Sequence, residues 1–582
     1  MKHISSKISL LLMCFMLVGA TAYAETYKYA VKKPAKKAEL ERCRRGQGSA
    51  ELSINNVRAR INTSGNMWYD GSTARYFVPK DGNSTAMFCA ALWIGGQDAN
   101  LQLRVAALKF GQSGDDFWPG PLTVDANASV DKAVCEQWDK HFKITKAEVE
   151  YFVDGFEYQG GTFIGVDASR ATEAIKTWPA HGDVSKNQSK FMAPFFDRNG
   201  DGVYSWEDGD YPYYDLSGEL CPAKQKEQWA ELGLPFIPTP TMESDTTNPN
   251  YGTGGVVKAY GGLLVDQVLK GDETIWWVFN DKGNAHTESG SENPIGLEIR
   301  AQAFAFAMND EINNMTFYSY EIINRSTFTL TNTYFSQWVD PDLGYAHDDY
   351  VGCDVERGLG YCYNGKATDG PGTGSYSGNP PAIGIDFFQG PYMDPDGRDN
   401  PKVDDIKVAD VMGASVLDPY RNEDGTVNHV LLTEDAYKFK DFWYPKSRDS
   451  IDACAINGVN FGNGIVDDER FGMRRFVYYN NAEGGNGEPD KATDYYNYLR
   501  GMWKDGSKMY YGGDGYISGA GLDKSINADF MFPGNSDIWG WGTRTNGKED
   551  HGKNNVWTEQ TAGNAAADRR FMQSAGPFTL EP

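Results

Sequence analysis

The chain has 582 residues and a formal net charge of −25, so it is too long for one hydrophobic core and too acidic to attract nucleic acid or an anionic membrane. Hydrophobic residues make up 40% and aromatic residues 13%, which is sufficient for folding, and the many glycines and tyrosines favour strands and long loops over helices. Composition therefore predicts a mainly β, loop-rich protein of several domains.

The N-terminus has the features of a cleavable export signal. Lys2 and Lys7 precede the apolar stretch ISLLLMCFMLVG, which is too short to span a bilayer, and a small-residue cleavage site ends at Ala24. We therefore predict a signal peptide over residues 1–24, no membrane span, and a secreted or cell-surface location. Residues 25–50 hold eight Lys and Arg but three Glu, and we expect them to form a basic, flexible lead-in.

Residues 51–193 are predicted to form a β-rich domain with a helical insertion. The segments LSINNVRARIN, ARYFVPK, MFCAALWIGG and LQLRVAALKF have the composition of strands and are separated by Gly, Asn and Asp turns. The spacing of apolar residues in DKAVCEQWDKHFKITKAEVEYFVDGF then predicts one or two short helices, and ATEAIKTW predicts another.

An acidic loop follows, with the sequence DRNGDGVYSWED. Its spacing matches a calcium-binding loop, in which oxygen ligands occupy the first, third, fifth, seventh, ninth and twelfth positions and a glycine at the sixth allows a sharp turn. The expected ligands are Asp197, Asn199, Asp201, the Val203 carbonyl, Ser205 and Asp208. A solvated turn without metal and a catalytic acid cluster are the alternatives.

We expect these loop residues to be structural ligands and not catalytic groups. A general acid needs a raised pKa, whereas a bound cation stabilises the charged form of a carboxylate, and the sequence places no histidine close to the loop. The aspartate at the twelfth position, where an EF-hand has glutamate, is similar to dockerin and related exported calcium loops.

This loop and a Pro-rich connection are assigned to residues 194–254, with a short helix near PAKQKEQWAELG. Residues 255–582 are predicted to form a sandwich-like domain with long acidic and Gly-rich loops. ETIWWVFND, IGLEIRAQAFAFAM, NNMTFYSYEIINRS and TLTNTYFSQWVD read as four successive strands with short gaps, which favours an antiparallel sandwich. Trp276 and Trp277 alternate across the first of these strands, so we expect one of them in the core and consider sugar stacking for the other.

A second acidic group lies at the end of the fourth strand and is a weaker candidate for calcium. Its members are Asp340, Asp342, Asp348, Asp349 and Asp354. So many carboxylates converge only around a cation or in a well-solvated loop, and a catalytic carboxylate pair is a third alternative. Residues 393–405 and 457–469 are weaker acidic segments of the same kind.

Seven cysteines follow residue 24, and export permits them to form disulfides. Cys353 and Cys362 are close in sequence, so we predict a disulfide between them that braces the second acidic group. The odd number leaves one thiol without a partner inside the chain.

Catalytic signatures are sparse. The sequence contains no HExxH, GxSxG or P-loop pattern, and its histidines are scattered. A glycosidase needs two carboxylates across a cleft, a requirement that 80 acidic residues make uninformative.

Several segments together resemble the large uncharacterised exported proteins of Bacteroidota-type bacteria, many of which are type IX secretion cargo. The segments are NMWYDGSTARYFVPK, AALWIGGQD, DDFWPGPL, DRNGDGVYSWEDGDYP, GDETIWWVFND, WVDPDLGYAHDDYVGCD, FGNGIVDDERFGMRRFVYYNN and MQSAGPFTL. The resemblance implies a secreted or surface location and calcium loops, and it implies no particular activity. No sorting domain follows GPFTLEP, which reads as the start of a strand without a partner, so we expect the sequence to be part of a longer polypeptide.

The sequence therefore predicts an exported, calcium-stabilised structural or adhesion-type protein with no identifiable catalytic site, whose partners are surface glycans or other surface proteins. A secreted polysaccharide-active hydrolase and a non-catalytic carbohydrate-binding protein are the alternatives.

Overall fold

The computed structural model describes residues 42–112, 114–214, 216, 268–397, 399–400, 457–462, 465–537 and 556–582. It also describes the backbone of two short hairpins, β13 (Lys258–Ala259) with β14 (Gly262–Leu263) and β22 (Ala436–Phe439) with β23 (Phe442–Pro445). The predicted signal peptide and the helix expected near PAKQKEQWAELG lie outside the described residues. Residues Cys43–Pro582 belong to one compact unit. Among the described residues, strands account for 35% and helices for 11%, which confirms the prediction of a mainly β protein with few short helices.

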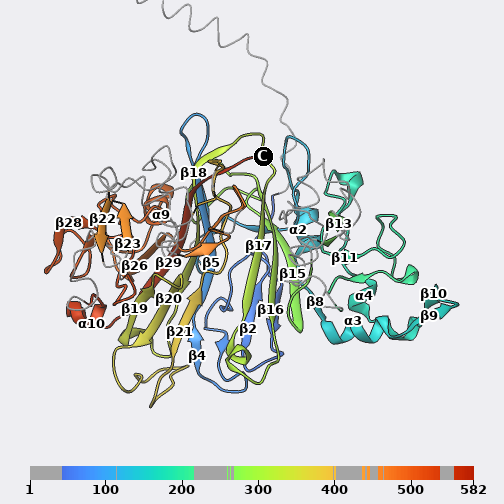
Figure 1. Cartoon of the computed structure of the whole chain (residues 1–582), viewed down its shortest axis with the longest axis horizontal. Coiled ribbons are helices and arrows are strands. Elements are labelled where there is room, and N and C mark those ends of the chain that lie inside the picture. The colour runs from blue at the N-terminus through green and yellow to red at the C-terminus, as the bar shows by residue number, and fades with distance from the viewer. Residues whose placement is uncertain are drawn as a thin grey trace, which may run out of the picture. The chain divides into compact units, whose positions relative to one another are not determined.

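The two largest sheets in the described part of the chain are five-stranded and antiparallel (Figure 1). The first sheet has the order β26-β29-β18-β5-β6, formed by β26 (Arg475–Asn480), β29 (Arg569–Leu580), β18 (Leu330–Asp340), β5 (Cys89–Gln97) and β6 (Leu103–Ala107). The second has the order β17-β16-β15-β7, with β8 also paired to β15, and is formed by β17 (Phe317–Asn324), β16 (Leu297–Ala305), β15 (Glu273–Asn280), β7 (Trp118–Pro119) and β8 (Phe142–Thr145).

Smaller sheets complete the β-structure. A four-stranded sheet is formed by β1 (Ser49–Leu52), β2 (Arg58–Asn62), β3 (Tyr76–Phe77) and β4 (Thr85–Met87), and a three-stranded sheet by β19 (Asp349–Asp354), β20 (Leu359–Asn364) and β21 (Ala382–Asp386). The two-stranded sheets with described side chains are β9 (Phe156–Gln159) with β10 (Thr162–Val166), β11 (Phe195–Phe196) with β12 (Tyr211–Pro212), β24 (Gly458–Val459) with β25 (Arg470–Phe471), and β27 (Tyr510–Tyr511) with β28 (Asp523–Asn527).

Sequence order predicts the second sheet better than the first. β15, β16 and β17 are antiparallel neighbours, as their succession in the sequence indicates. β18 leaves this sheet and instead pairs with β5 from the N-terminal part and with β29 at the C-terminus. The last segment is a strand as expected, but the expectation that it lacks a partner is wrong, because β29 lies between β26 and β18.

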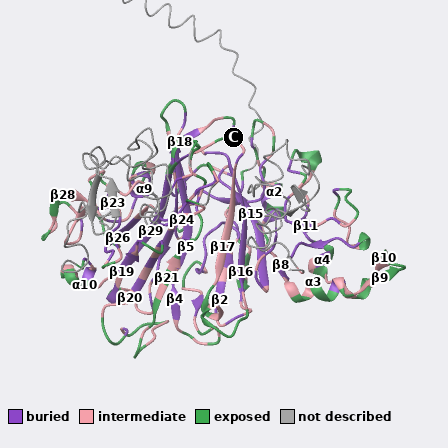
Figure 2. Ribbon diagram, in the orientation of Figure 1, coloured by how far each residue is buried: buried purple, intermediate pink, exposed green. Residues whose placement is uncertain are grey.

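β15 is buried on both of its faces (Figure 2). Ile275, Trp277 and Phe279 belong to the main hydrophobic core, which is shared with the first five-stranded sheet, whereas Trp276 and Val278 belong to a second core. Both tryptophans are therefore buried, and the idea that one of them stacks on a sugar is wrong.

The second core is covered by short helices, as the sequence predicts. They are α2 (Lys132–Trp138), α3 (Lys146–Val153) and α4 (Glu173–Lys176). In α3, Thr145 and Glu148 form a reciprocal capping box, which satisfies two backbone N–H groups at the helix start. Two further helices, α9 (Ala492–Leu499) and α10 (Glu559–Ala562), lie in the C-terminal part.

A disulfide joins Cys43 to Cys135 with a Cα–Cα distance of 5.8 Å, and it connects the start of the compact unit to α2. The predicted disulfide between Cys353 and Cys362 is wrong, because both thiols are free and buried. Cys353 lies opposite Gly360 and Cys362 opposite Val351, so the two cysteines are diagonal neighbours. Diagonal side chains lie about 7–8 Å apart, which is beyond the reach of a disulfide.

None of the helices in the described ranges has the length and apolar character that a membrane crossing requires. The Cys43–Cys135 disulfide is typical of a compartment outside the cytosol.

Candidate metal centre

The acidic loop at residues 197–208 is organised by hydrogen bonds to its own backbone. The Asp197 carboxylate is buried and accepts hydrogen bonds from the backbone N–H groups of Gly200 and Gly202, each at 2.7 Å. Asn199 Oδ1 accepts from the backbone of Asp201 at 3.0 Å, and Asp201 Oδ1 accepts from the backbone of Val203 at 2.7 Å. Gly202 has φ of 70°, which is the sharp turn that the sequence predicts at this position.

The end of the loop is a short 3₁₀ helix, η3 (Trp206–Asp208), which Ser205 caps by accepting a hydrogen bond from the Asp208 backbone. The loop's side-chain oxygens are therefore in contact with nearby backbone donors. Whether they also bind calcium stays a prediction.

Two residues that sequence reasoning passed over hold this loop in place. Asp210 is fully buried and accepts hydrogen bonds from the backbone of Arg198 and Ser205, each at 2.9 Å, and burial raises its pKa to about 6. His181 Nε2 accepts a hydrogen bond from the backbone of Tyr204 at 2.8 Å. The expectation that no histidine lies near the loop is therefore wrong. No pattern of spacing could have revealed His181, because it reaches the loop through the tertiary fold.

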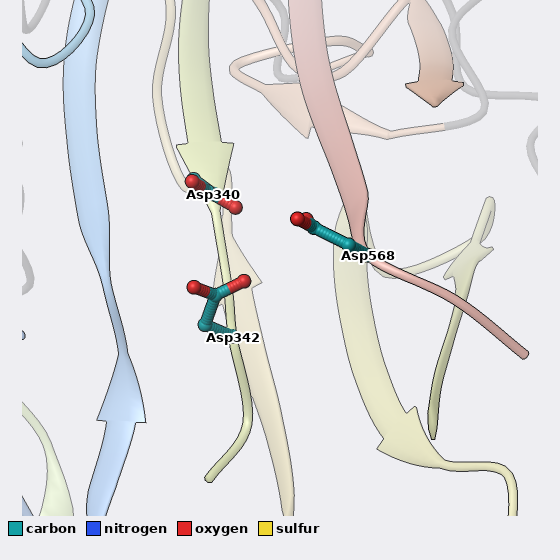
Figure 3. Close-up of side chains that lie close together, drawn as sticks. All are labelled: Asp340, Asp342 and Asp568. Atoms are coloured by element: carbon teal, nitrogen blue, oxygen red, sulfur yellow. The ribbon is translucent and has the colours of Figure 1, made fainter. Parts of the chain in front are cut away.

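A second acidic group lies where the end of β18 meets the start of β29 (Figure 3). Asp340 is the last residue of β18, Asp342 follows two residues later, and Asp568 immediately precedes β29. Because the two strands are antiparallel neighbours, the end of one lies beside the beginning of the other. One carboxylate oxygen from each aspartate lies within 4.8 Å of the other two, and this group can hold a metal ion.

The oxygens of this group have few donors to satisfy them. Asp340 has no solvent exposure, and neither of its carboxylate oxygens has a hydrogen-bond partner. Asp342 Oδ1 also lacks a hydrogen-bond partner. Burial and then the charge of Asp342 raise the pKa of Asp340 well above its usual range. Burial, followed by the charge of Asp568, raises the pKa of Asp342 to about 6. A buried anion without donors is costly, so this arrangement favours either a proton or a cation.

Arg570 supplies the nearest positive charge. Its Nη2 atom lies 3.1 Å from Asp340 Oδ2, its Nη1 atom contacts Asp568, and its Nε atom lies 3.0 Å from Glu488 Oε1. Glu488 also contacts Lys109 at 3.0 Å, and Lys109 lies 3.4 Å from Glu288. This connected network contains five carboxylates and two cationic side chains, so negative charge exceeds positive charge around the three aspartates.

The structure brings together only two of the five residues that the sequence assigned to this group, Asp340 and Asp342. Asp348 is fully buried, and its Oδ2 atom lies 4.0 Å from Lys366 Nζ. Asp349 accepts a hydrogen bond from the Leu343 backbone at 2.9 Å. Asp354 lies at the far end of β19 and pairs with Arg357 at 2.6 Å. In the described part of the chain, the grouping of three ligand atoms is completed by Asp568, whose position in sequence gave no signal.

The two weaker acidic segments lie side by side. Asp467 Oδ1 accepts hydrogen bonds from the backbone of Asp396 at 2.8 Å and of Gly397 at 2.9 Å, and Asp399 Oδ1 accepts from the backbone of Gly462 at 2.8 Å. Parts of both segments lie outside the described residues. In the parts that the structure describes, these carboxylates join one segment to the other.

Comparisons with known proteins do not add a name or an activity, since no family model, no curated protein and no solved structure matches this chain.

Proposed function

We propose that the protein is an exported structural or adhesion-type protein whose β-sheet body is stabilised by calcium, with surface glycans or other surface proteins as its partners. The observation that supports this proposal best is the convergence of Asp340, Asp342 and Asp568, in which Asp340 is fully buried and is contacted by Arg570 but receives no hydrogen bond of good geometry. A cation there would bind the ends of two neighbouring strands, β18 and β29, and would therefore stabilise the first five-stranded sheet.

The chemistry of the donors favours calcium. Three carboxylates provide oxygen ligands alone, which hard cations prefer, whereas zinc sites are usually built from cysteine and histidine. Calcium also accepts irregular ligand geometry and water as further ligands, and magnesium demands a nearly ideal octahedron. Calcium sites of extracellular modules have dissociation constants of about 10⁻⁴–10⁻³ M. A site of this affinity in an exported protein is occupied when the surrounding calcium concentration exceeds that value. The loop from Asp197 to Asp208 is proposed as a second calcium site.

The structural role is favoured over a polysaccharide hydrolase. A hydrolase of this kind would present a carboxylate pair in a cleft lined by exposed aromatic rings. Among the described residues, the tryptophans are buried or half-buried, and the exposed aromatic rings, Tyr151, Tyr158, Phe388 and Tyr392, are outside the aspartate group. Asp340 and Asp568 of that group are in contact with Arg570. These features support a cation that holds strands together.

The test is the unfolding free energy of the purified chain in calcium and in chelator. We expect calcium to stabilise the protein by about 2.7 kcal/mol at roughly a hundredfold excess over the dissociation constant, because it binds the native state. Asp340→Asn with Asp342→Asn should remove most of this gain, whereas Asp197→Ala with Asp201→Ala should remove a smaller part. Asp354→Asn is the matched control and should keep the full gain. Identical unfolding of the unchanged protein in calcium and in chelator would refute the calcium proposal.

The adhesive role requires its own measurement. A glycan array probed with the purified chain should show calcium-dependent binding to a subset of glycans, without release of reducing sugar. Hydrolysis of any bound glycan would overturn the non-catalytic assignment.

A further inference from the structure

His286 lies where the two large sheets meet, and it has no solvent exposure. Its Nδ1 atom is 2.8 Å from the carbonyl oxygen of Val105 in β6, the edge strand of the first sheet. Its Nε2 atom is 2.6 Å from the carbonyl oxygen of Asp281, the residue after β15 in the second sheet. The imidazole ring therefore connects the two sheets.

These two contacts define the protonation of the ring. A backbone carbonyl oxygen only accepts hydrogen bonds, so each ring nitrogen must carry a hydrogen to bond with it. A neutral imidazole carries one hydrogen and would direct the lone pair of its other nitrogen at a carbonyl oxygen. Only the imidazolium cation satisfies both contacts of His286.

Two buried carboxylates balance this charge. Asp116 Oδ2 lies 3.6 Å from Nδ1, and Asp281 Oδ2 lies 3.6 Å from Nε2. Asp281 accepts hydrogen bonds from the backbone N–H groups of residues 295, 296 and 297 at 2.6–2.8 Å. Asp116 accepts from the backbone of residues 107, 288 and 289 at 3.0–3.3 Å. Both anions are therefore fixed by the backbone whether or not the ring is charged.

The net electrostatic effect on the ring agrees with the geometry. Burial by itself lowers the pKa of His286, but Asp116, Asp281 and the two carbonyl oxygens outweigh it, so the pKa is raised above its usual value. Burial raises the pKa of Asp116 above its usual value, and the charge of His286 and the hydrogen bonds that Asp116 accepts offset only part of this effect. The neighbouring acids on these segments have other partners, since Asp115 lies 3.5 Å from Arg45 and Glu288 lies 3.4 Å from Lys109. Of the neighbouring cations, Arg104 lies 3.0 Å from Asp98, and Lys282 donates to the Asn127 carbonyl at 2.6 Å while it also interacts with Asp281.

Two other histidines provide internal references. His181 Nδ1 lies 2.7 Å from the carbonyl of Lys190, while its Nε2 accepts from the backbone of Tyr204, so His181 is neutral with its hydrogen on Nδ1. His141 has no hydrogen-bond partner on either nitrogen, and burial lowers its pKa to about 3. The same chain thus contains a neutral histidine of defined tautomer, a neutral histidine without partners and, by this geometry, a charged one.

We propose that His286 is a fixed imidazolium at neutral pH, and that it acts as a pH-sensitive lock between β6 and the turn that follows β15. The lock is closed at acidic and neutral pH. It opens when alkaline pH removes the second hydrogen, because one ring nitrogen then faces a carbonyl oxygen without a hydrogen between them. The inference does not depend on calcium binding.

A long-range ¹H–¹⁵N spectrum of the purified chain labelled with ¹⁵N-histidine tests this proposal. At pH 7 we expect both nitrogens of His286 to show protonated shifts, while His181 shows one protonated and one unprotonated nitrogen. His286→Gln assigns the signal. If that variant does not fold, single substitutions to Gln of the other six histidines assign the His286 signal by elimination; these are His3, His141, His181, His347, His429 and His551. An unprotonated nitrogen on His286 at pH 7 would overturn the proposal.

Substitution of a counter-ion gives a second readout. Asp116→Asn should lower the pH at which His286 loses its second hydrogen by one unit or more, which is a tenfold or greater change in the proton dissociation constant. Glu292→Gln, on the same connecting segment but without a contact to the ring, should leave this titration unchanged. An unaltered His286 titration in Asp116→Asn would contradict the assigned charge balance.

Discussion

The loop at residues 197–210 and the aspartate group at the junction of β18 and β29 are both rich in acidic residues, but their carboxylates are satisfied in opposite ways. In the loop, Asp197 finds two backbone donors within five residues of itself. At the junction, Asp340 is fully buried, receives no hydrogen bond from the backbone, and has its ion pair with Arg570, from the other end of the chain, at 3.1 Å. Acidic composition alone therefore does not identify a cation site. The informative feature is the convergence of three carboxylate oxygens around a buried aspartate, since Asp348 is also buried without a hydrogen-bond partner but does not belong to such a group.

Substitution of Arg570 should reduce the free energy of unfolding more than any substitution in the acidic loop. Arg570→Met leaves Asp340 buried without its counter-charge, and breaking a buried ion pair in this way typically costs about 3–5 kcal/mol. We expect this loss in urea unfolding with chelator, and a smaller loss in calcium, because a bound cation replaces part of the missing positive charge.

The matched control is Arg357→Met, which removes an exposed partner of Asp354 and should have little effect on stability in both conditions, because solvent screens a surface pair. An equal loss for Arg570→Met in calcium and in chelator would contradict the view that the junction binds a cation.

Substitution in the loop should have an intermediate effect. Asp197→Ala leaves the backbone N–H groups of Gly200 and Gly202 without their acceptor, at a cost of about 1–3 kcal/mol. This cost should appear in chelator as well, since the hydrogen bonds exist without an ion. Any additional cost in calcium measures the contribution of an ion in the loop, and equal stability of Asp197→Ala and the unchanged protein in chelator would show that the loop is not self-supported.

The pH dependence of stability tests whether Asp349 is a metal ligand, as the sequence predicts. In the structure, Asp349 accepts one backbone hydrogen bond instead. Burial raises its pKa to about 9, so between about pH 4 and pH 9 the folded state retains a proton that the unfolded state releases. Stability that depends on this proton is therefore lost as pH rises across that window.

Asp349→Asn mimics the protonated form and should flatten the pH dependence by on the order of 1 kcal/mol per pH unit. Urea unfolding at pH 5, 7 and 9 measures this slope. An unchanged slope would mean that Asp349 is ionised when folded, as a calcium ligand would be.

Asp354→Ala should give the smallest effect. Asp354 pairs with the exposed Arg357, and surface pairs of this kind contribute little to stability because solvent screens them. We expect no change in calcium dependence, which a calcium titration followed by thermal unfolding measures. A reduced response to calcium in this variant would mean that Asp354 is a ligand of the metal after all.

The sequence by itself determined the features that depend on neighbouring residues. The strands from Glu273 to Asn324 follow from alternating apolar residues, and α3 follows from apolar spacing and its capping box. The turn at Gly202 likewise follows from local spacing, because Asp197 reaches its backbone donors within a few residues. For the same reason, the sequence identified two members of the junction group, Asp340 and Asp342, which follow one strand.

Only the tertiary structure decided which distant segments meet. Asp568 and Arg570 reach Asp340 because β29 pairs with β18. Likewise, the disulfide joins Cys43 to Cys135, two cysteines that are far apart in the sequence. The charge of His286 depends on carbonyl groups from two different sheets. Such contacts depend on strand pairing between remote parts of the chain, which local spacing does not encode, so the buried and unsatisfied groups become visible only when the sheets are assembled.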